Sequence, residues 1–237
     1  MSRIFAIADA HLSRVNPKPM DIFGRNWLGH PQVFFDRWLE ADIASDDIVL
    51  IPGDISWATH LEEALPDLLD IAALPGQKII LRGNHDYWWS SIGKLRQALP
   101  PNMFALQNDA LRFHDTTFCG SRGWSCPDSE GFSLEDDKIY KREIQRLRLS
   151  LEAAKRLGAP QDVLLLHYPP TAMNGRRTGF TDLIEEFEPK CVVYGHLHGV
   201  SGERLISHWE GIPLYFVAAD ALNFKPFLLP FEVCASG

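Results

Sequence analysis

Two histidines stand one residue apart between two glycines near the end of the chain. They belong to the motif Tyr194-Gly195-His196-Leu197-His198-Gly199, which directly follows an apolar run of strand type. Because side chains alternate along a strand, both imidazoles can point the same way, and the glycines allow a sharp turn at the strand end. Such a pair could hold a metal ion, or it could be two ordinary surface histidines.

Four other apolar runs are also followed by polar residues that can bind metal. The residues after these runs are Asp9-Ala10-His11, Pro52-Gly53-Asp54, Arg82-Gly83-Asn84-His85-Asp86 and His167. In an open α/β sheet, ligand sites form at the carboxyl ends of the strands, so we expect these side chains to meet. The candidate metal ligands are Asp9, His11, Asp54, Asn84, His167, His196 and His198.

Each candidate also has an ordinary structural interpretation when it is taken alone. Asp9 could cap a turn, Asn84 could be a left-handed turn residue, and His167 could be a core histidine. A shared metal site explains all five positions at once, which favours it. Carboxylates and imidazoles suit manganese, which we expect, or iron, zinc or nickel. Seven ligands suit two ions about 3.5–4 Å apart, with Asp54 as the bridge.

The elements that position these residues follow from the hydrophobic pattern. The predicted buried strands are Ile4–Ala8, Ile48–Ile51, Lys78–Leu81, Val163–Leu166 and Cys191–Tyr194. Amphipathic helices are predicted over Pro31–Ile43 and His60–Leu74. Proline is favoured at the first position of a helix, which suits Pro31, and Thr59 is a suitable N-cap for the second helix. The start therefore alternates strand and helix, which is typical of a mostly parallel sheet covered by helices.

The second half of the chain has a different pattern. Short strands are predicted over Met103–Leu106, Ala110–Phe113 and Thr116–Cys119. A long charged helix over Leu134–Leu157 is closed by Gly158, a natural C-terminal cap. From Val200 onward we predict short strands with turns at Gly211-Ile212-Pro213 and Phe224-Lys225-Pro226.

Length and composition exclude several classes of protein. The 237 residues contain no repeat and no dividing linker, so we expect a single domain over 1–237. The net charge of −8 argues against a non-specific binder of nucleic acid or of anionic membranes. No apolar run is long enough to span a membrane, and Ile4–Ala8 is too short for a signal-peptide core. We expect a cytoplasmic protein with reduced cysteines, whose sequence specifies no oligomeric state.

Together, the five motifs resemble the signature of the calcineurin-like metallophosphoesterases. The resemblance implies an α/β fold, a four-layer α/β/β/α sandwich of two mixed β-sheets flanked by helices, and a dinuclear metal centre. It implies that one ion is held by Asp9, His11, Asp54 and His198, and the other by Asp54, Asn84, His167 and His196. His85 would lie over the substrate phosphate. Many members carry an acid or an arginine three residues after Asp54, where this chain has Trp57, which puts in doubt any substrate contact made there.

The function that follows is metal-dependent hydrolysis of a phosphoester of a small molecule, with a phosphodiester favoured over a monoester. Two ions would polarise the phosphoryl oxygens and lower the pKa of a bridging water, whose hydroxide attacks. His85 would be a general acid or a hydrogen-bond donor to the phosphate. Asp86 would orient His85 or hold its proton, or else be a helix N-terminal residue. The alternative is a non-catalytic metal-bound scaffold or binding module, against which the intact ligand set and His85 argue.

Aromatic and basic residues beside the motifs bear on the substrate. Trp57 could line the rim, and of Trp88 and Trp89 we expect one in the core and one at the rim. The segment Thr171 to Thr178 could form a pocket wall, and its Arg176 and Arg177 are either contacts for a second phosphate or solvated loop charges. Arg82 could reach the phosphate, although a strand-end salt bridge is favoured.

Overall fold

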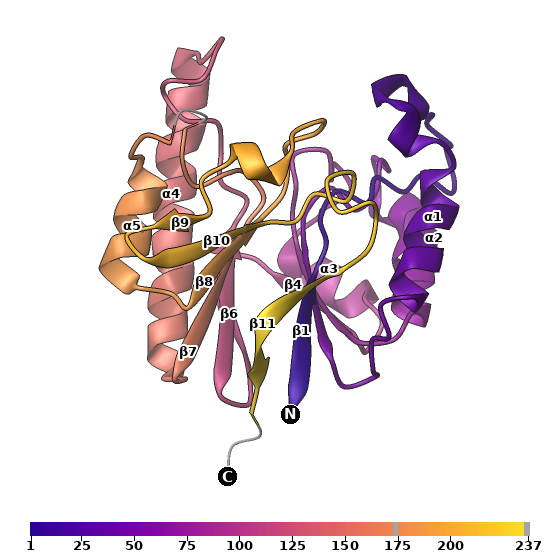
Figure 1. The fold of residues 1–237 in the computed structure, drawn as a ribbon, viewed down its shortest axis with the longest axis horizontal. Coiled ribbons are helices and arrows are strands. Elements are labelled where there is room, and N and C mark those ends of the chain that lie inside the picture. The colour runs from indigo at the N-terminus through magenta and orange to yellow at the C-terminus, as the bar shows by residue number, and fades with distance from the viewer. Residues whose placement is uncertain (173–174, 235–237) are drawn as a thin grey trace.

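The computed structural model describes residues 1–172 and 175–234. Two mixed β-sheets pack against each other between two layers of helices, with α1 and α2 on one side and α4 and α5 on the other (Figure 1). The predicted four-layer sandwich is therefore confirmed. No helix among the described residues is long and apolar enough to cross a membrane.

The first sheet has the strand order β11-β1-β2-β3-β4. Its strands are β1 (Ser2–Ala6), β2 (Ile48–Pro52), β3 (Gln77–Leu81), β4 (Met103–Leu106) and β11 (Phe227–Val233). The four strands β1 to β4 run parallel, and β11 pairs antiparallel with β1 at the edge. Helices α1 (His30–Leu39), α2 (Leu61–Ala73) and α3 (Ile92–Ala98) connect these strands.

The second sheet has the order β5-β6-β7-β8-β10-β9. Its strands are β5 (Ala110–Phe113), β6 (Thr116–Ser121), β7 (Gln161–Leu166), β8 (Cys191–Tyr194), β9 (His208–Trp209) and β10 (Ile212–Phe216). The central strands are parallel, and β5 and β9 pair antiparallel at the two edges. Helix α4 (Leu134–Leu157) and helix α5 (Gly179–Phe187) belong to this half.

Strands buried on both faces explain why the apolar runs are continuous rather than alternating. In β2, Ile48 and Leu50 belong to the layer between the two sheets, whereas Val49 and Ile51 pack in the layer that contains α1 and α2. The side chains of β7 divide in the same way between the middle layer and a third layer with α4 and α5. Each central strand is therefore fixed from both sides, which holds its carboxyl end still.

The predicted strands and helices are found, with shifts at their ends. Helix α4 has the predicted bounds, and Gly158 closes it in a left-handed conformation with a φ of 62°. Helix α1 ends four residues before the predicted Ile43, and the left-handed Asp42 (φ 54°) lies in the turn that follows. In α2, His60 takes the N-cap position predicted for Thr59, and the Glu63 carboxylate accepts both of their backbone N–H groups.

Three features of the fold differ from the sequence prediction. Strand β1 ends at Ala6 rather than at Ala8, although the next two residues still donate backbone hydrogen bonds to Leu50 and Val217. The turn predicted at 211–213 lies at Glu210 and Gly211, because Ile212 already begins β10. Helix α5, which the hydrophobic pattern did not reveal, begins after the N-cap Thr178.

Candidate metal centre

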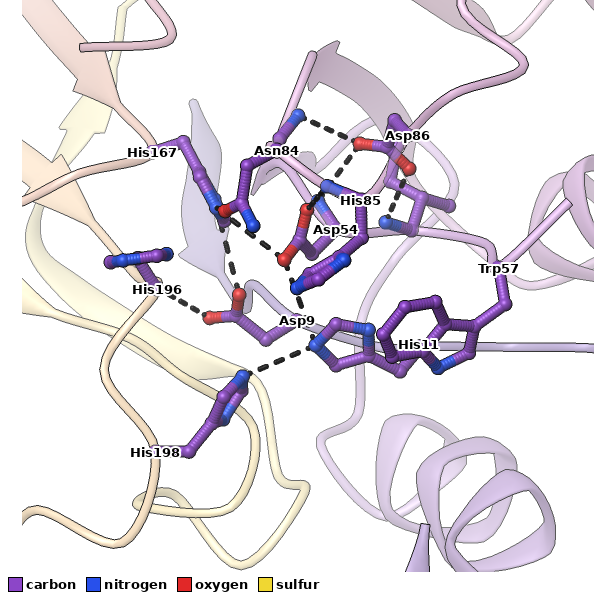
Figure 2. Close-up of polar contacts among 12 residues, drawn as sticks. Asp9, His11, Asp54, Trp57, Asn84, His85, Asp86, His167, His196 and His198 are labelled. Carbon is purple, nitrogen blue, oxygen red and sulfur yellow. Dashed lines mark hydrogen bonds and ion pairs between the residues drawn. The ribbon is translucent and has the colours of Figure 1, made fainter. Parts of the chain in front are cut away.

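The seven predicted ligands lie together at the carboxyl ends of the parallel strands (Figure 2). Six of them form two groups, in each of which the ligand atoms lie within 4.8 Å of one another. The first group contains Asp9, His11 and His198, and the second contains Asp54, His167 and His196. Asn84 adjoins the second group, with its Oδ1 2.6 Å from Nε2 of His167.

Asp54 lies between the two groups. Its Oδ2 is 3.7 Å from Nε2 of His11 in the first group and 3.5 Å from Nε2 of His167 in the second. Its Oδ1 accepts the backbone N–H of His85 at 2.8 Å. One oxygen is thus used to hold the backbone, and the other is left between the two sets of imidazoles, as a bridging ligand requires.

The two histidines of the motif Gly195-His196-Leu197-His198 (the GHLH motif) belong to different groups. The alternation of strand side chains does not apply to them, because β8 ends at Tyr194 and both follow it in a loop. His196 has a φ of 74°, and three other candidate ligands have left-handed backbones: Asp9, His11 and Asp54. Such conformations are costly for residues other than glycine and are concentrated at functional sites.

The glycines of the motifs give the ligands room. A Cβ atom at Gly53 would lie 2.6 Å from Nδ1 of His167, and one at Gly195 would lie 2.4 Å from Oδ2 of Asp9. Both distances are far below van der Waals contact, so neither position accepts a side chain without moving a candidate ligand.

The donor atoms fit a pair of metal ions. The buried atoms Asp9 Oδ1 and Asp54 Oδ2 have no hydrogen-bond partner among the described residues, although buried carboxylate oxygens are normally paired. Nε2 of His11 and Nε2 of His198 face each other at 3.2 Å. Nδ1 of His167 lies 3.0 Å from the Pro52 carbonyl, so in the neutral ring this nitrogen carries the proton and Nε2 has the lone pair that can bind metal.

Burial and nearby charge shift the pKa values of the candidate ligands. Burial raises the pKa of Asp9 to about 7 and lowers the pKa values of His11 and His196 to about 3, so these imidazoles are neutral and able to bind metal. Burial would also lower the pKa of His167, but the negative charge of Asp54 raises it to about 9. The carboxylates therefore favour positive charge at this position, which a bound cation would supply.

Two residues that match none of the five motifs contact the candidate ligands. Asp220 lies 3.3 Å from Nδ1 of His198 through one oxygen, and its other oxygen accepts the Gly199 N–H at 2.8 Å. Asp220 comes four residues after the end of β10, and the candidate ligands likewise follow the ends of other strands. This position after a strand is the signal that could have identified Asp220. Nε2 of the buried His30 is 3.2 Å from the backbone oxygen of His11.

His85 lies beside the ligands and against two aromatic rings. Its ring centre is 5.7 Å from that of His11, 4.4 Å from that of Trp57 and 6.3 Å from that of the exposed Tyr87. Trp57 stacks on His11 at 4.9 Å, so the position that departs from the family pattern does line the site. The expectation that one of Trp88 and Trp89 lies at the rim is wrong, because both are buried in the core.

Asp86 acts on the backbone that carries the ligands. Its buried carboxylate accepts the backbone N–H groups of Asp54, Ile55, Ser56 and Gly83 and the indole N–H of Trp88. Because α3 begins only at Ile92, Asp86 is not a helix N-terminal residue. It instead ties the loop after β2 to the loop after β3, which fixes Asp54 relative to His85 (Figure 2).

The substitution Asp86→Asn should destabilise the protein and weaken metal binding together. An amide offers one acceptor oxygen and places its NH₂ against N–H donors, so we expect a loss of about 1.5–3 kcal/mol in the free energy of unfolding. Urea unfolding and metal analysis would measure the two effects. The half-exposed Asp70, which pairs with Arg14 and contacts no candidate ligand, provides the control variant Asp70→Asn. An Asp86→Asn variant with unchanged stability and metal content would contradict the role of Asp86.

The basic residues predicted near the substrate make other contacts. Arg176 pairs with Asp128 at 2.9 Å, and Arg177 pairs with Asp182 at 2.6 Å and with Glu185, in agreement with solvated loop charges. Residues 173–174 of the expected pocket wall lie outside the described residues. Arg82 makes no ion pair within 1–172 and 175–234, so the predicted strand-end salt bridge is wrong.

Comparison with known proteins gives a family and a fold. A model of the calcineurin-like phosphoesterase family matches residues 2–200. Similar solved structures include a phosphopantetheinyl hydrolase (PptH) from Mycobacterium tuberculosis, which is 14% identical with a TM-score of 0.60, covering 100% of this chain and 99% of that one. The protein TT1561 from Thermus thermophilus is 11% identical with a TM-score of 0.61, covering 99% of this chain and 100% of that one.

The calcineurin-like phosphoesterase YfkN from Bacillus subtilis is 14% identical with a TM-score of 0.54, and the match covers 91% of this chain and 80% of that chain. At these identities the structural matches show a shared fold. A search of curated proteins finds no match to the sequence.

Proposed function

Because this chain belongs to the calcineurin-like phosphoesterase family, we propose that it is a hydrolase that cleaves a phosphodiester of a small molecule with two divalent metal ions. The observation that carries the proposal is the position of Asp54, whose unpaired Oδ2 lies within reach of imidazoles from both candidate ligand groups. A single carboxylate shared in this way is what a two-metal phosphoesterase needs.

The donor set supports a division of the ligands between the ions. One ion would be held by Asp9, His11, Asp54 and His198, and the other by Asp54, Asn84, His167 and His196. The mixture of carboxylate, amide and imidazole ligands supports manganese, with iron, zinc and nickel as alternatives. When bound, two such ions would neutralise the phosphate oxygens and activate a water molecule near neutral pH.

His85 is proposed to act on the substrate rather than on the metals. Its backbone N–H is held by the Asp54 carboxylate, so the ring has a fixed place relative to the ligands, and its buried Nδ1 has no partner among the described residues. The imidazole can donate a hydrogen bond to the phosphate or protonate the leaving oxygen. The structure thus supports Asp86 as a positioning residue that acts through the backbone of Asp54.

The surroundings of His85 support an organic ester. Trp57 packs against the imidazole, and Tyr87 lies edge-on to it with ring centres 6.3 Å apart, so the leaving group would meet apolar surface next to the proton donor. A phosphodiester carries two organic substituents and gains more from such contacts than a monoester does.

We also propose that the whole chain forms one domain. The apolar layer between the sheets is built by side chains from both, including Leu50 and Ile79 from the first and Val163 and Val193 from the second. The candidate centre takes ligands from both halves, since His11 and His198 meet there. Separating the halves would therefore expose the core and divide the site.

Metal removal should abolish hydrolysis reversibly. We expect the manganese-loaded protein to hydrolyse bis-p-nitrophenyl phosphate faster than p-nitrophenyl phosphate, and treatment with a chelator to remove both activities. Added manganese should restore them, with two ions bound per chain by elemental analysis. The measurement is the release of p-nitrophenolate, followed by absorbance.

Other outcomes of the same experiment lead to different conclusions. A preference for the monoester would overturn the choice of a diester but keep the hydrolase. Two bound ions without turnover of any phosphoester would favour a non-catalytic scaffold or binding module on this fold. A protein that binds no divalent metal would contradict the proposed centre itself.

A further inference from the structure

A polar cavity lies close to the candidate metal centre, and none of the candidate ligands lines it. It is formed by the ends of β3 and β6, the turn after β4 and one side of α4, and its volume is about 70 Å³. One water molecule needs roughly 10–15 Å³ of such space, so the cavity can hold a group of several atoms. Its charged lining residues are Arg82, Arg122, Glu143 and Arg146.

The cavity has more positive than negative charge. The carboxylate of Glu143, which is 1% exposed, pairs with Arg146 at 2.6 Å and with Arg122 at 3.5 Å. Arg82 makes no ion pair within the described ranges, so three guanidinium groups face one carboxylate. Asp109, on the turn after β4, does not balance this charge, because it pairs with Arg96 at 2.5 Å.

Two of the arginines that line the cavity each have a buried hydrogen-bond donor without a partner among the described residues. Nε of Arg82 and Nε of Arg122 have no partner within residues 1–172 and 175–234, although both atoms are shielded from solvent. The guanidinium of Arg122 lies over the ring of Trp124, 4.4 Å from the ring centre, and this cation–π contact helps to fix its position. Buried donors without acceptors cost free energy, which an anion at this position would recover.

We propose that this cavity binds a small oxyanion of the phosphate class through Arg82, Arg122 and Arg146. Guanidinium groups present N–H donors in a planar fork that matches the oxygens of a phosphate, and binding is strongest where the groups are partly desolvated. One phosphate would balance the excess charge and provide acceptors for the unpaired Nε donors.

The cavity is joined to the candidate centre through the backbone. Only Gly83 separates Arg82 from Asn84, and the backbone carbonyl of Arg122 accepts the N–H groups of His167 and Tyr168 at 3.1 and 3.0 Å. The oxyanion is either free inorganic phosphate, whose oxygens resemble those of the phosphomonoester that diester hydrolysis yields, or a second anionic group on the substrate. The anion site itself does not depend on the proposed function, whereas the choice of source does.

Binding of radiolabelled inorganic phosphate to the full-length, metal-loaded protein tests the site by equilibrium dialysis. We expect two phosphate ions per chain, one at the metal centre and one in the cavity. Arg82→Gln and the half-exposed Arg146→Gln should each weaken the second site about 10- to 100-fold, the effect of losing a hydrogen bond to a charged group. Glu143→Gln should strengthen it, because it removes the competing carboxylate.

The matched control is Arg142→Gln, an exposed arginine next to Glu143 on α4 that does not line the cavity. It should leave both sites unchanged. The proposal is overturned if Arg82→Gln and Arg146→Gln leave phosphate binding as it is in the wild type. It is also overturned if Glu143→Gln weakens phosphate binding. Because the cavity holds no metal ligand, chelated protein should still bind one phosphate even if the hydrolase proposal fails.

Kinetics of the same variants distinguish the two sources. For an anionic group on the substrate, Arg82→Gln should raise KM for a phosphodiester that carries a terminal phosphate and leave KM for bis-p-nitrophenyl phosphate unchanged. If the oxyanion is free phosphate, Arg82→Gln should lose phosphate binding at the cavity and leave KM unchanged for both substrates. A KM raised equally for both substrates, without loss of phosphate binding, would overturn the proposal.

Discussion

Asp54→Asn is expected to lose metal from both ligand groups and to reduce phosphodiester hydrolysis by at least about 1,000-fold. Oδ2 of Asp54 lies 3.7 Å from the His11 ring nitrogen and 3.5 Å from that of His167, so one substitution removes a ligand from each group. Bound metal supplies several kcal/mol of transition-state stabilisation, and each 1.36 kcal/mol corresponds to about tenfold in rate. Elemental analysis and turnover of bis-p-nitrophenyl phosphate measure the two effects.

The reason that asparagine cannot replace Asp54 is geometric as well as electrostatic. Oδ1 already accepts the backbone N–H of His85 at 2.8 Å, and an amide has a single oxygen. The variant must therefore give up either that hydrogen bond or the bridging contact. Its NH₂ group would also face imidazole nitrogens or a backbone donor.

A buried aspartate outside the centre provides the matched control for this prediction. Asp67 on α2 accepts hydrogen bonds from the Ser56 hydroxyl and the Arg14 backbone, and it belongs to neither ligand group. Asp67→Asn should retain both metals even if it lowers stability. Asp54→Asn protein that still binds two ions per chain would contradict the assignment of Asp54 as the shared ligand.

The places of the candidate ligands in the fold could be predicted because metal binding restricts residue type and the fold restricts position. Apolar runs such as Ile48–Ile51 and Cys191–Tyr194 mark strands buried on both faces, and parallel strands bring their carboxyl ends to one edge. An Asp or a His directly after such a run therefore has a predictable location. No comparable rule restricts the residues that hold the ligands in place.

The roles that could not be predicted depend on contacts between distant loops. Asp86 holds backbone N–H groups 30 to 32 residues earlier in the chain, and His198 meets His11 across 187 residues. Hydrophobic patterns do not say which histidine of the GHLH motif joins which group, because this depends on the left-handed φ of His196; only the family resemblance assigned His198 to the ion of Asp9 and His11. The burial of Trp89 likewise depends on tertiary packing, including the bond from its indole N–H to Gln107.

His85→Ala is expected to reduce kcat by about 100- to 10,000-fold, the usual contribution of a positioned proton donor, while two metal ions remain bound. The imidazole is not a member of either ligand group, and only its backbone N–H contacts Asp54, so the substitution leaves the ligands in place. Turnover and elemental analysis of the variant are measured together. The exposed His60→Ala is the control and should behave as the wild type.

The leaving group decides which role His85 has. A general acid matters most for an alkoxide that needs a proton, so His85→Ala should slow an alkyl diester far more than bis-p-nitrophenyl phosphate, whose nitrophenolate leaves without protonation. A hydrogen bond to the phosphate instead helps every ester equally, because the phosphate is the same in all of them. Since the ring packs against Trp57 with Tyr87 edge-on to it, where the organic group would lie, we expect the unequal loss. A variant that retains full kcat on both esters would show that His85 contributes to neither step.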